Sequence, residues 1–479
     1  MNSQLRQNNA SSASRQRRDA FAAMHNRRTF LSGAGMGMGS LALNSLLSPN
    51  LLGSTAARTH LPARAKNVIF LHMVGAPSQL DLFDYKPKLQ EYDRKLAPDE
   101  FVKGKRFAFL RGHPKLLGTP YEFKKCGQAG TYISELFPHL QTVADDLCVI
   151  RSMHTEEFNH APAQMLFHTG LNRRGNPSIG SWVDYGLGSA NENLPAYVVF
   201  LSGSTPGAGA SLWNNGFLPS VHQGTQFRSQ GEPVLFLENP KSVDRSRRRR
   251  IIDGVQALNQ MNHQRIGDPE IVTRMEQYEM AFRMQSSVPD LMAINDEPQH
   301  IIDLYGDGEF ARQCLYARRM VERGVRFVEL FHAQWDTHNS QDRRLRTLCK
   351  QVDQPITALL KDLKQRGLLD DTVVIWGGEF GRTPMLQGDE SKEKCGRDHH
   401  KEAFTIWMAG GGIQGGLNYG ATDDMGYYAA ENKVHIRDFH ATLLHLLGID
   451  HELSTFRFQG LDQRLTGVEE AHVLKDILA

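Results

Sequence analysis

The sequence predicts an α/β fold in which helices cover both faces of a mostly parallel central sheet. Short and nearly continuous apolar runs, rich in β-branched and aromatic residues, recur along the chain, and such runs are typical of strands buried on both faces. Helical patterns lie between them, and strand–helix alternation favours a doubly wound arrangement. With 40% hydrophobic and 23% charged residues among 479, the composition is that of a globular protein with a large core.

Each element follows from a local pattern. The expected strands are residues 67–73, 147–151, 197–201, 325–331, 372–376 and 404–409. Residues 356–366 predict a helix that ends at Gly367, because their leucines and isoleucine recur on one face. Residues 439–447 predict a second helix, which ends at Gly448.

The stretch from 241 to 298 is more polar and predicts a helical insertion in an otherwise single domain at 58–479. It begins with a run of arginines, 245 and 247–250, which indicates a solvated helix face rather than a nucleic-acid patch. The whole chain carries a formal net charge of only +2. A near-neutral body has no field to attract nucleic acid, so that class of partner is not expected.

The first 57 residues resemble an export signal. Arg27 and Arg28 precede Phe30, a Gly/Ala/Leu-rich stretch follows at 33–52, and small residues lie at 54–57. This pattern is similar to a twin-arginine signal and predicts a periplasmic or secreted protein; a chance arginine pair on an amphipathic helix is the alternative. No other apolar run is long enough for a transmembrane helix. The five cysteines have no metal-binding spacing, and their pairing stays open.

Residues that can bind metals follow or precede several expected strands, at the sheet edge where ligands bind in open α/β folds. The groups are Asp336 and His338 after one strand, Glu379 after the next, and His399 with His400 before the last. Each group alone is typical of a surface turn or a core histidine. Together they predict an ion of the zinc, manganese or iron type, because imidazole nitrogens and carboxylate oxygens are its preferred ligands.

Longer motifs resemble the bacterial domain-of-unknown-function family numbered 1501 (DUF1501), within the alkaline-phosphatase/sulfatase clan. The matching segments are Gly75-x-Pro77-Ser78-x-x-Asp81, Gly180-Ser181-Trp182-Val183, Trp335-Asp336-x-His338, Glu379-Phe380-Gly381-Arg382-Thr383-Pro384, Gly396-Arg397-Asp398-His399 and Ala441-Thr442. The resemblance implies an alkaline-phosphatase-like fold and metal-assisted hydrolysis of sulfate or phosphate esters by a Ser, Thr or Cys nucleophile.

The chain departs from the clan pattern at the nucleophile. In sulfatases that residue lies nine positions before a Thr-Gly, and counting back from Thr169-Gly170 reaches His160. His160 could attack phosphorus, bind metal or act as a base, or mark a site kept only for binding. Phe380 stands where the clan has a second ligand, and the first-strand aspartate is missing. Arg397 could pair with a tetrahedral anion, or it could pair with nearby acids, as could Arg382.

The resulting hypothesis is an exported hydrolase of sulfate or phosphate esters that uses one divalent metal (Zn, Mn or Ca). Its substrate would be a sulfated or phosphorylated small molecule or glycan. The expected metal ligands are Asp336, His338, Glu379 and His399 or His400, and the expected catalytic residues are His160 and Arg397. The alternative is a non-catalytic exported binding protein on a degenerate sulfatase-like scaffold. The substrate, the metal and the oligomeric state cannot be read from the sequence.

Overall fold

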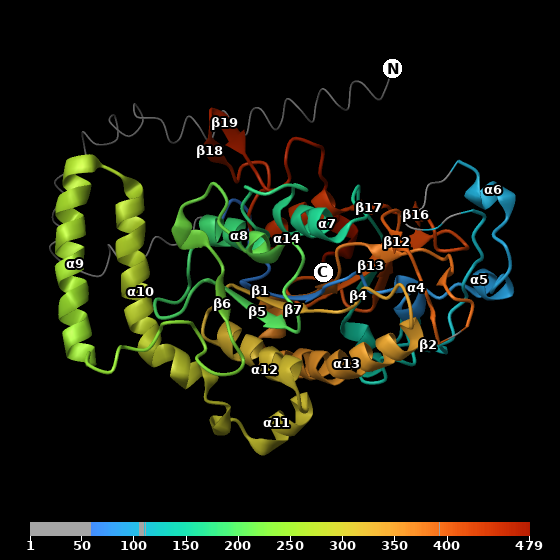
Figure 1. The fold of residues 1–479 in the computed structure, drawn as a ribbon, viewed down its shortest axis with the longest axis horizontal. Coiled ribbons are helices and arrows are strands. Elements are labelled where there is room, and N and C mark those ends of the chain that lie inside the picture. The colour runs from blue at the N-terminus through green and yellow to red at the C-terminus, as the bar shows by residue number, and fades with distance from the viewer. Residues whose placement is uncertain (1–58, 105–109, 111, 392) are drawn as a thin grey trace. The chain divides into compact units, whose positions relative to one another are not determined.

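A nine-stranded sheet forms the centre of the protein (Figure 1). The computed structural model describes residues 59–104, 110, 112–391 and 393–479, which all fall in one unit, Thr59–Ala479. The expected export signal at 1–57 lies outside the described residues, so it stays a prediction.

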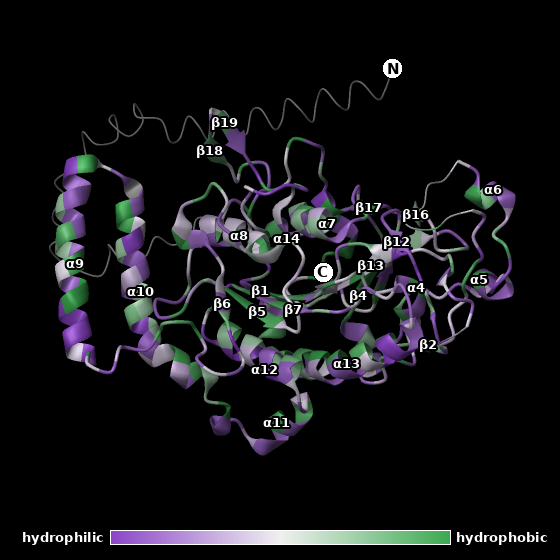
Figure 2. Cartoon of the chain, in the orientation of Figure 1, coloured by the Kyte–Doolittle hydropathy of each residue, from purple (hydrophilic) through white to green (hydrophobic). Residues whose placement is uncertain are grey.

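The strand order in this sheet is β14-β4-β13-β8-β1-β7-β5-β6, and β17 pairs with β4 beside that path. Their bounds are β1 Asn67–Met73, β4 Cys148–His154, β5 Tyr197–Ser202, β6 Thr225–Phe227, β7 Phe327–His332, β8 Thr372–Gly377, β13 Phe404–Ala409, β14 Leu417–Tyr419 and β17 Val434–His435. The residues of β1, β7, β8 and β13 are all buried, which is why these strands have continuous apolar sequences (Figure 2).

The predicted α/β fold with a mostly parallel sheet is confirmed. Strand β1 pairs in parallel with both β7 and β8, and β5 pairs in parallel with β7 and β6. Strand β13 differs, because it runs antiparallel to β8 and to β4. An apolar run has no direction, so the sequence pattern could not distinguish β13 from its parallel neighbours.

Helices cover both faces of the sheet (Figure 1). One face carries α12 (Glu309–Glu322) and α13 (Gln341–Gln365), and the other carries α7 (His160–Thr169), α8 (Ile179–Leu187) and α14 (Ile436–Leu446). Helix α13 begins 15 residues before the predicted start. Its first half continues the same buried stripe through Leu345, Leu348 and Val352, and Pro355 lies inside the helix without ending it.

Residues 241–298 contain two long helices, α9 (Arg245–Ile266) and α10 (Pro269–Met292), which pack side by side at the left of Figure 1. The remaining α-helices of the described residues are α4 Gln79–Leu82, α5 Pro87–Glu91, α6 Asp99–Val102 and α11 Gln299–Tyr305. Short strands form two-stranded sheets: β2 Phe123–Cys126 with β3 Thr131–Ser134, β9 Gly381–Arg382 with β12 His399–His400, β10 Gln387–Gly388 with β11 Cys395–Gly396, β15 Ala421–Thr422 with β16 Ala429–Glu431, and β18 Phe456–Phe458 with β19 Leu461–Gln463.

All five cysteines carry free thiols. Among the helices of the described residues, none combines the length and the apolar content that a membrane crossing requires.

The three adjacent parallel strands β8, β1 and β7 end at one edge of the sheet. Glu379 follows β8, Gly75 follows β1, and Asp336 follows β7. Strand β4 ends at the same edge before α7, and antiparallel β13 begins there after β12. This topology therefore brings the loops with metal-ligand residue types together.

Candidate functional site

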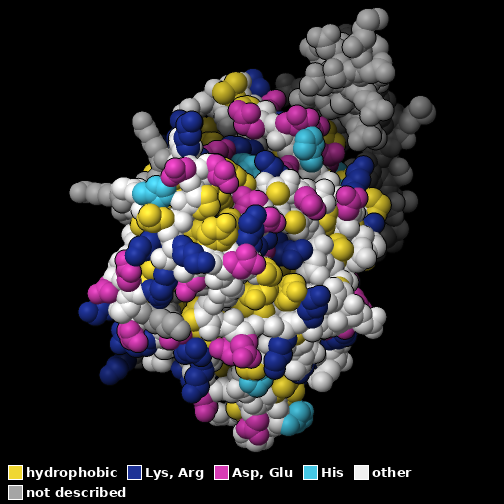
Figure 3. All heavy atoms as spheres, turned by 90° about the vertical axis from the view of Figure 1, so that its right-hand side faces the viewer, with side chains coloured by type: hydrophobic (Ala, Val, Ile, Leu, Met, Phe, Trp, Pro, Cys, Tyr) yellow, Lys and Arg dark blue, Asp and Glu magenta, His cyan; other side chains and the backbone are white. Residues whose placement is uncertain are grey.

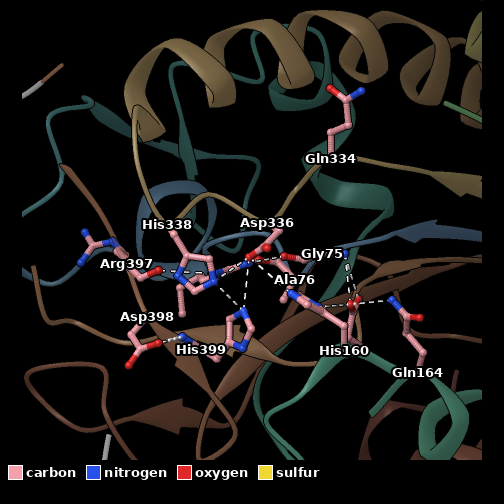
Figure 4. A network of polar contacts seen from close by, with 12 residues as sticks. Gly75, Ala76, His160, Gln164, Gln334, Asp336, His338, Arg397, Asp398 and His399 are labelled. Atoms are coloured by element: carbon pink, nitrogen blue, oxygen red, sulfur yellow. Dashed lines mark hydrogen bonds and ion pairs between the residues drawn. The ribbon is translucent and has the colours of Figure 1, made fainter. Parts of the chain in front are cut away.

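A single carboxylate oxygen is the centre of the site (Figure 4). Asp336 Oδ1 lies 3.3 Å from His160 Nε2, 3.0 Å from His338 Nε2 and 3.2 Å from His399 Nε2. The Nε2 atoms of His338 and His399 lie 2.9 Å apart. Three imidazole nitrogens thus meet at one carboxylate.

Three separate segments position these side chains. His160 is the first residue of α7, so its side chain lies at the end of the helix that faces the sheet edge. Asp336 and His338 belong to the loop after β7, and His399 belongs to β12, directly opposite Arg382 of β9.

Two of the imidazoles are held from behind by oxygen acceptors. His160 Nδ1 lies 2.7 Å from Glu379 Oε1, and His338 Nδ1 lies 2.6 Å from Gln387 Oε1. When Nδ1–H donates to an oxygen, the imidazole lone pair remains on Nε2. Metal-binding histidines are usually oriented in this way. The Nε2 atoms of both rings face Asp336, so a ring that carries no proton on Nε2 directs its lone pair toward that carboxylate.

Glu379 lies behind His160 rather than beside Asp336. Its buried carboxylate accepts hydrogen bonds from the Gly75 backbone N–H at 3.1 and 3.2 Å and from Gln164 Nε2 at 3.0 Å. Its second oxygen lies 3.4 Å from His72 Nε2. Glu379 is an expected metal ligand, whereas these contacts place its carboxylate against Nδ1 of His160, on the far side of that ring from Asp336.

The loop after β1 approaches the Asp336 loop so closely that only glycine fits. Gly75 has a φ of 111°, and a Cβ on it would lie 2.4 Å from the backbone nitrogen of Asp336. This close approach brings the Gly75 N–H to Glu379.

Charge is divided unevenly among the site residues. Burial opposes ionisation of Asp336, yet hydrogen bonds from the three imidazoles and nearby Arg382 hold its pKa far below the usual value. Burial also opposes a charge on His160, but hydrogen bonds to Asp336 and Glu379 raise its pKa to about 9. Burial lowers the pKa of His399 to about 4, despite its hydrogen bond to Asp336. At neutral pH, His160 is therefore cationic and His399 neutral.

The two arginines of the sequence motifs have different surroundings. Buried Arg382 donates from NH2 to Asp336 Oδ1 at 2.6 Å and from Nε to the Ala76 carbonyl at 2.9 Å. Buried Arg397 forms a bidentate ion pair with Asp81, at 2.7 and 3.1 Å, and points away from the three imidazoles (Figure 4). Of the two readings of Arg397, the geometry matches structural pairing with an acid rather than anion binding.

The side chain of His400 also points away from Asp336. Its Nε2 lies 2.5 Å from the carbonyl oxygen of Tyr427, and the ring is buried. Successive residues of a strand point to opposite faces, so His399 and His400 of β12 cannot both face Asp336. His399 is the one that does.

The donor set fits one divalent metal ion. His160, Asp336 and His399 each offer a ligand atom, and these atoms lie within 4.8 Å of one another. His338 adds a third imidazole at 3.0 Å from the same carboxylate oxygen. Ligands about 2.0–2.1 Å from a tetrahedral ion are about 3.3 Å apart, close to the separations found here. Three imidazoles and one carboxylate are a combination suited to zinc and similar metals.

A second group of buried polar residues extends inward from Glu379. The His72 and His168 rings lie 4.5 Å apart, between centroids. His168 Nδ1 lies 2.8 Å from Glu329 Oε1, and the Tyr197 hydroxyl donates to Glu329 Oε2 at 2.6 Å. This group gives a second buried carboxylate–histidine pair that does not touch Asp336.

A cavity of about 270 Å³ lies at the ends of β5 and β7. It is lined by Ser202, Gly203, Asp307, Gly308, Glu309, Phe310, His332, Ala333, Gln334 and Gln351. Gln334 belongs to the same loop as Asp336, but its side chain points away from the imidazoles (Figure 4). The described lining has hydroxyl, amide and carboxylate groups but no lysine or arginine, so it suits neutral hydroxyl-bearing groups better than anions.

Sequence reasoning missed the residues that support the imidazoles: His72, Gln164 and Gln387. His72 lies inside an apolar strand, where a lone polar residue signals a buried partner. Gln164 follows His160 by one helical turn, a spacing at which side chains meet. Nothing in the local sequence marks Gln387.

Known structures align with this chain at low identity. The PsFucS1 sulfatase from Pseudoalteromonas sp. is 11% identical, with 90% of this chain and 76% of that chain covered and a TM-score of 0.36. The alkaline phosphatase of the Antarctic bacterium TAB5 is 11% identical, with 73% and 92% covered and a TM-score of 0.31. The lipoteichoic acid synthase LtaP from Listeria monocytogenes is 10% identical, with 85% and 76% covered and a TM-score of 0.30.

No curated protein matches the chain. One family model does, over residues 65–478, and its description is "Protein of unknown function (DUF1501)". This match spans nearly all of the described residues and includes every residue of the site. The chain therefore belongs to the DUF1501 family.

Proposed function

We propose that this protein is a metal-dependent hydrolase of sulfate or phosphate esters, with one divalent ion held by His160, Asp336, His338 and His399. The observation that carries the proposal is the polarity of the imidazoles. Oxygen acceptors hold Nδ1 of His160 and of His338, while their Nε2 atoms face Asp336. A metal ion that displaces the Nε2 proton of His160 would therefore meet nitrogen lone pairs directed at a common point.

The protein orients the metal ligands and leaves the site open to solvent. Glu379 fixes the ring of His160, and Arg382 fixes the carboxylate of Asp336. The side chains of His160, His338 and Asp336 are 25%, 24% and 41% exposed, so an ester can reach the site from solvent. A bound divalent ion would polarise the ester oxygen and make an attacking water more acidic.

Both nitrogens of His160 are engaged in this arrangement, one with Glu379 and one toward Asp336. Among the three readings of His160, we therefore favour a metal ligand over a nucleophile. Direct attack by water is the expected route, without a phosphohistidine.

The nature of the substrate follows from charge. Arg382 and a bound divalent ion would favour an anionic ester at the metal position, whereas the cavity at the ends of β5 and β7 has no lysine or arginine in its described lining. A sulfated or phosphorylated molecule with a neutral, hydroxyl-bearing remainder, such as a glycan, would match both. Export through the twin-arginine route is a further part of the proposal, motivated by Arg27 and Arg28.

The test is hydrolysis of an aryl sulfate and an aryl phosphate by protein loaded with Zn²⁺ or Mn²⁺. Replacing His338 with Ala should abolish turnover and weaken metal binding. Replacing His400 with Asn is the matched control, because that buried histidine contacts Tyr427 instead. Equal activity in wild type and H338A, or activity that survives complete removal of metal, would contradict the proposal.

A non-catalytic binding protein is the second candidate, and one observation favours it. Asp336 Oδ1 already has Arg382 at 2.6 Å, so its charge is partly neutralised without a metal. If that candidate is right, the protein should hydrolyse neither aryl ester, whichever divalent metal is added, while sulfate or phosphate binds to the site.

A further inference from the structure

Helix α9 exposes an unusual number of large apolar side chains. Ile251, Leu258, Met261 and Ile266 are 44%, 63%, 59% and 57% exposed. All four belong to one 22-residue helix at the edge of the protein (Figure 1). Scattered single apolar residues are normal on a protein surface, but a group on one helix indicates a contact that the isolated chain leaves unmade.

These side chains share one face. Ile251 and Leu258 are seven residues apart, so they lie within about 20° of each other around the helix axis. Met261 and Ile266 flank them, within about 80° of Ile251 on either side. Hydrophobic and hydrophilic stretches alternate along α9 in Figure 2.

The opposite face of α9 is already used. Ile252 is the one buried residue of the helix, and the guanidinium groups of Arg245 and Arg249 lie 4.8 and 4.9 Å from the ring centroid of Phe282 on α10. Arg249 also pairs with Glu279 of α10 at 2.9 Å. The exposed apolar stripe therefore faces away from α10.

The same helix concentrates positive charge. It contains six arginines and one aspartate, a formal net charge of +5, in a chain whose total is +2. By their positions on the helix, Arg247 and Arg248 flank the apolar stripe at its start. Within the described part of the chain, no acidic side chain forms an ion pair with Arg247, Arg248 or Arg250. By contrast, acidic and basic side chains are interspersed on the face shown in Figure 3.

We propose that α9 binds the surface of an anionic lipid bilayer. The apolar stripe would enter the boundary between headgroups and acyl chains, and the arginines would contact lipid phosphates, as basic amphipathic helices do. A nucleic acid would use the arginines but not four apolar side chains. A second copy meeting through α9 would bring two helices of charge +5 together. An anionic bilayer would contact both the apolar side chains and the arginines. This inference does not depend on the metal site.

The experiment measures co-sedimentation of the full chain with vesicles. Wild type should bind vesicles of phosphatidylcholine mixed with phosphatidylglycerol, bind pure phosphatidylcholine far more weakly, and lose binding as salt rises. Each arginine removed near the surface should weaken binding about fivefold, so replacing Arg247, Arg248 and Arg250 with Gln should weaken it about a hundredfold. Leu258→Glu should also release the protein.

Leu461→Gln is the matched control, because this leucine on β19 is 64% exposed and lies outside α9. It should bind vesicles like wild type, and circular dichroism should show that all variants are folded. Three results would overturn the proposal: no binding to the anionic vesicles, binding that neither set of α9 variants reduces, or a dimer in light scattering that Leu258→Glu converts to a monomer. Binding to duplex DNA but not to vesicles would overturn it as well.

Discussion

Replacing Glu379 with Gln should show how much the orientation of His160 contributes to metal affinity, because His160 itself is kept. The change keeps the size of a fully buried side chain but removes the charge that accepts His160 Nδ1–H at 2.7 Å. A hydrogen bond to a charged group contributes about 1.5–3 kcal/mol. Because 1.4 kcal/mol corresponds to a tenfold change, and such supporting partners usually contribute 10–100-fold to metal affinity, the Kd for Zn²⁺ should rise about 10–100-fold.

The same substitution should change how stability depends on pH in the metal-free protein. Hydrogen bonds to Asp336 and Glu379 raise the pKa of His160 to about 9, above its ordinary 6.5. A raised histidine pKa stabilises the folded state below pH 6.5, and this contribution is lost as pH rises through 9. In E379Q the pKa of His160 should fall, so the variant should lose most stability at low pH and approach wild type above pH 9.

Isothermal titration calorimetry with a competing chelator measures the Kd, and an NMR titration of the histidines measures the pKa. Glu329→Gln is the matched control, since Glu329 is equally buried and pairs with His168 at 2.8 Å, away from Asp336. It should cost stability without changing metal affinity. Wild-type metal affinity in E379Q, or an equal loss in E329Q, would refute the orienting role of Glu379.

Three further outcomes follow from the site geometry. At pH 7 metal binding should release the proton that His160 carries, whereas His399, with a pKa of about 4, is already neutral; calorimetry in buffers of different ionisation enthalpy measures the release, and no release would contradict this charge distribution. Arg397→Met should lower the free energy of unfolding by about 3–5 kcal/mol in a denaturant titration, since it leaves the buried carboxylate of Asp81 without its cationic partner, yet the metal Kd should stay unchanged. Asp336→Asn should leave purified protein without bound metal by elemental analysis, and stoichiometric metal in that variant would argue against Asp336 as a ligand.

The sequence predicted six of the nine strands of the central sheet within a few residues, because these strands are mostly buried and leave a continuous apolar signal. It missed β6, β14 and β17, which have only two or three residues each. Strand β1 begins and ends at the predicted residues, Asn67 and Met73. Strand direction was not predictable, as β13 shows, because direction is set by partners distant in the chain. The start of α13 was missed because a proline inside the helix hid the continuity of its buried stripe.

The candidate site was predictable in its location and less so in its details. Asp336 and His338 follow parallel β7, and His399 precedes antiparallel β13, so the end of one strand and the start of the other bring them to the same edge. The sequence could not show that Glu379 faces the back of His160, because a carboxylate at the sheet edge can lie on either side of an imidazole. The role of Arg397 likewise depends on Asp81, a residue 316 positions earlier in the chain.

The most direct measurement of the central claim is X-ray absorption at the metal edge of protein loaded with one equivalent of Zn²⁺. We expect one ion per chain, with three imidazole nitrogens and one carboxylate oxygen about 2.0–2.1 Å away, and loss of one imidazole in H338A. An ion surrounded by water alone, or a spectrum unchanged by H338A, would show that these side chains pair with Asp336 only and do not hold a metal.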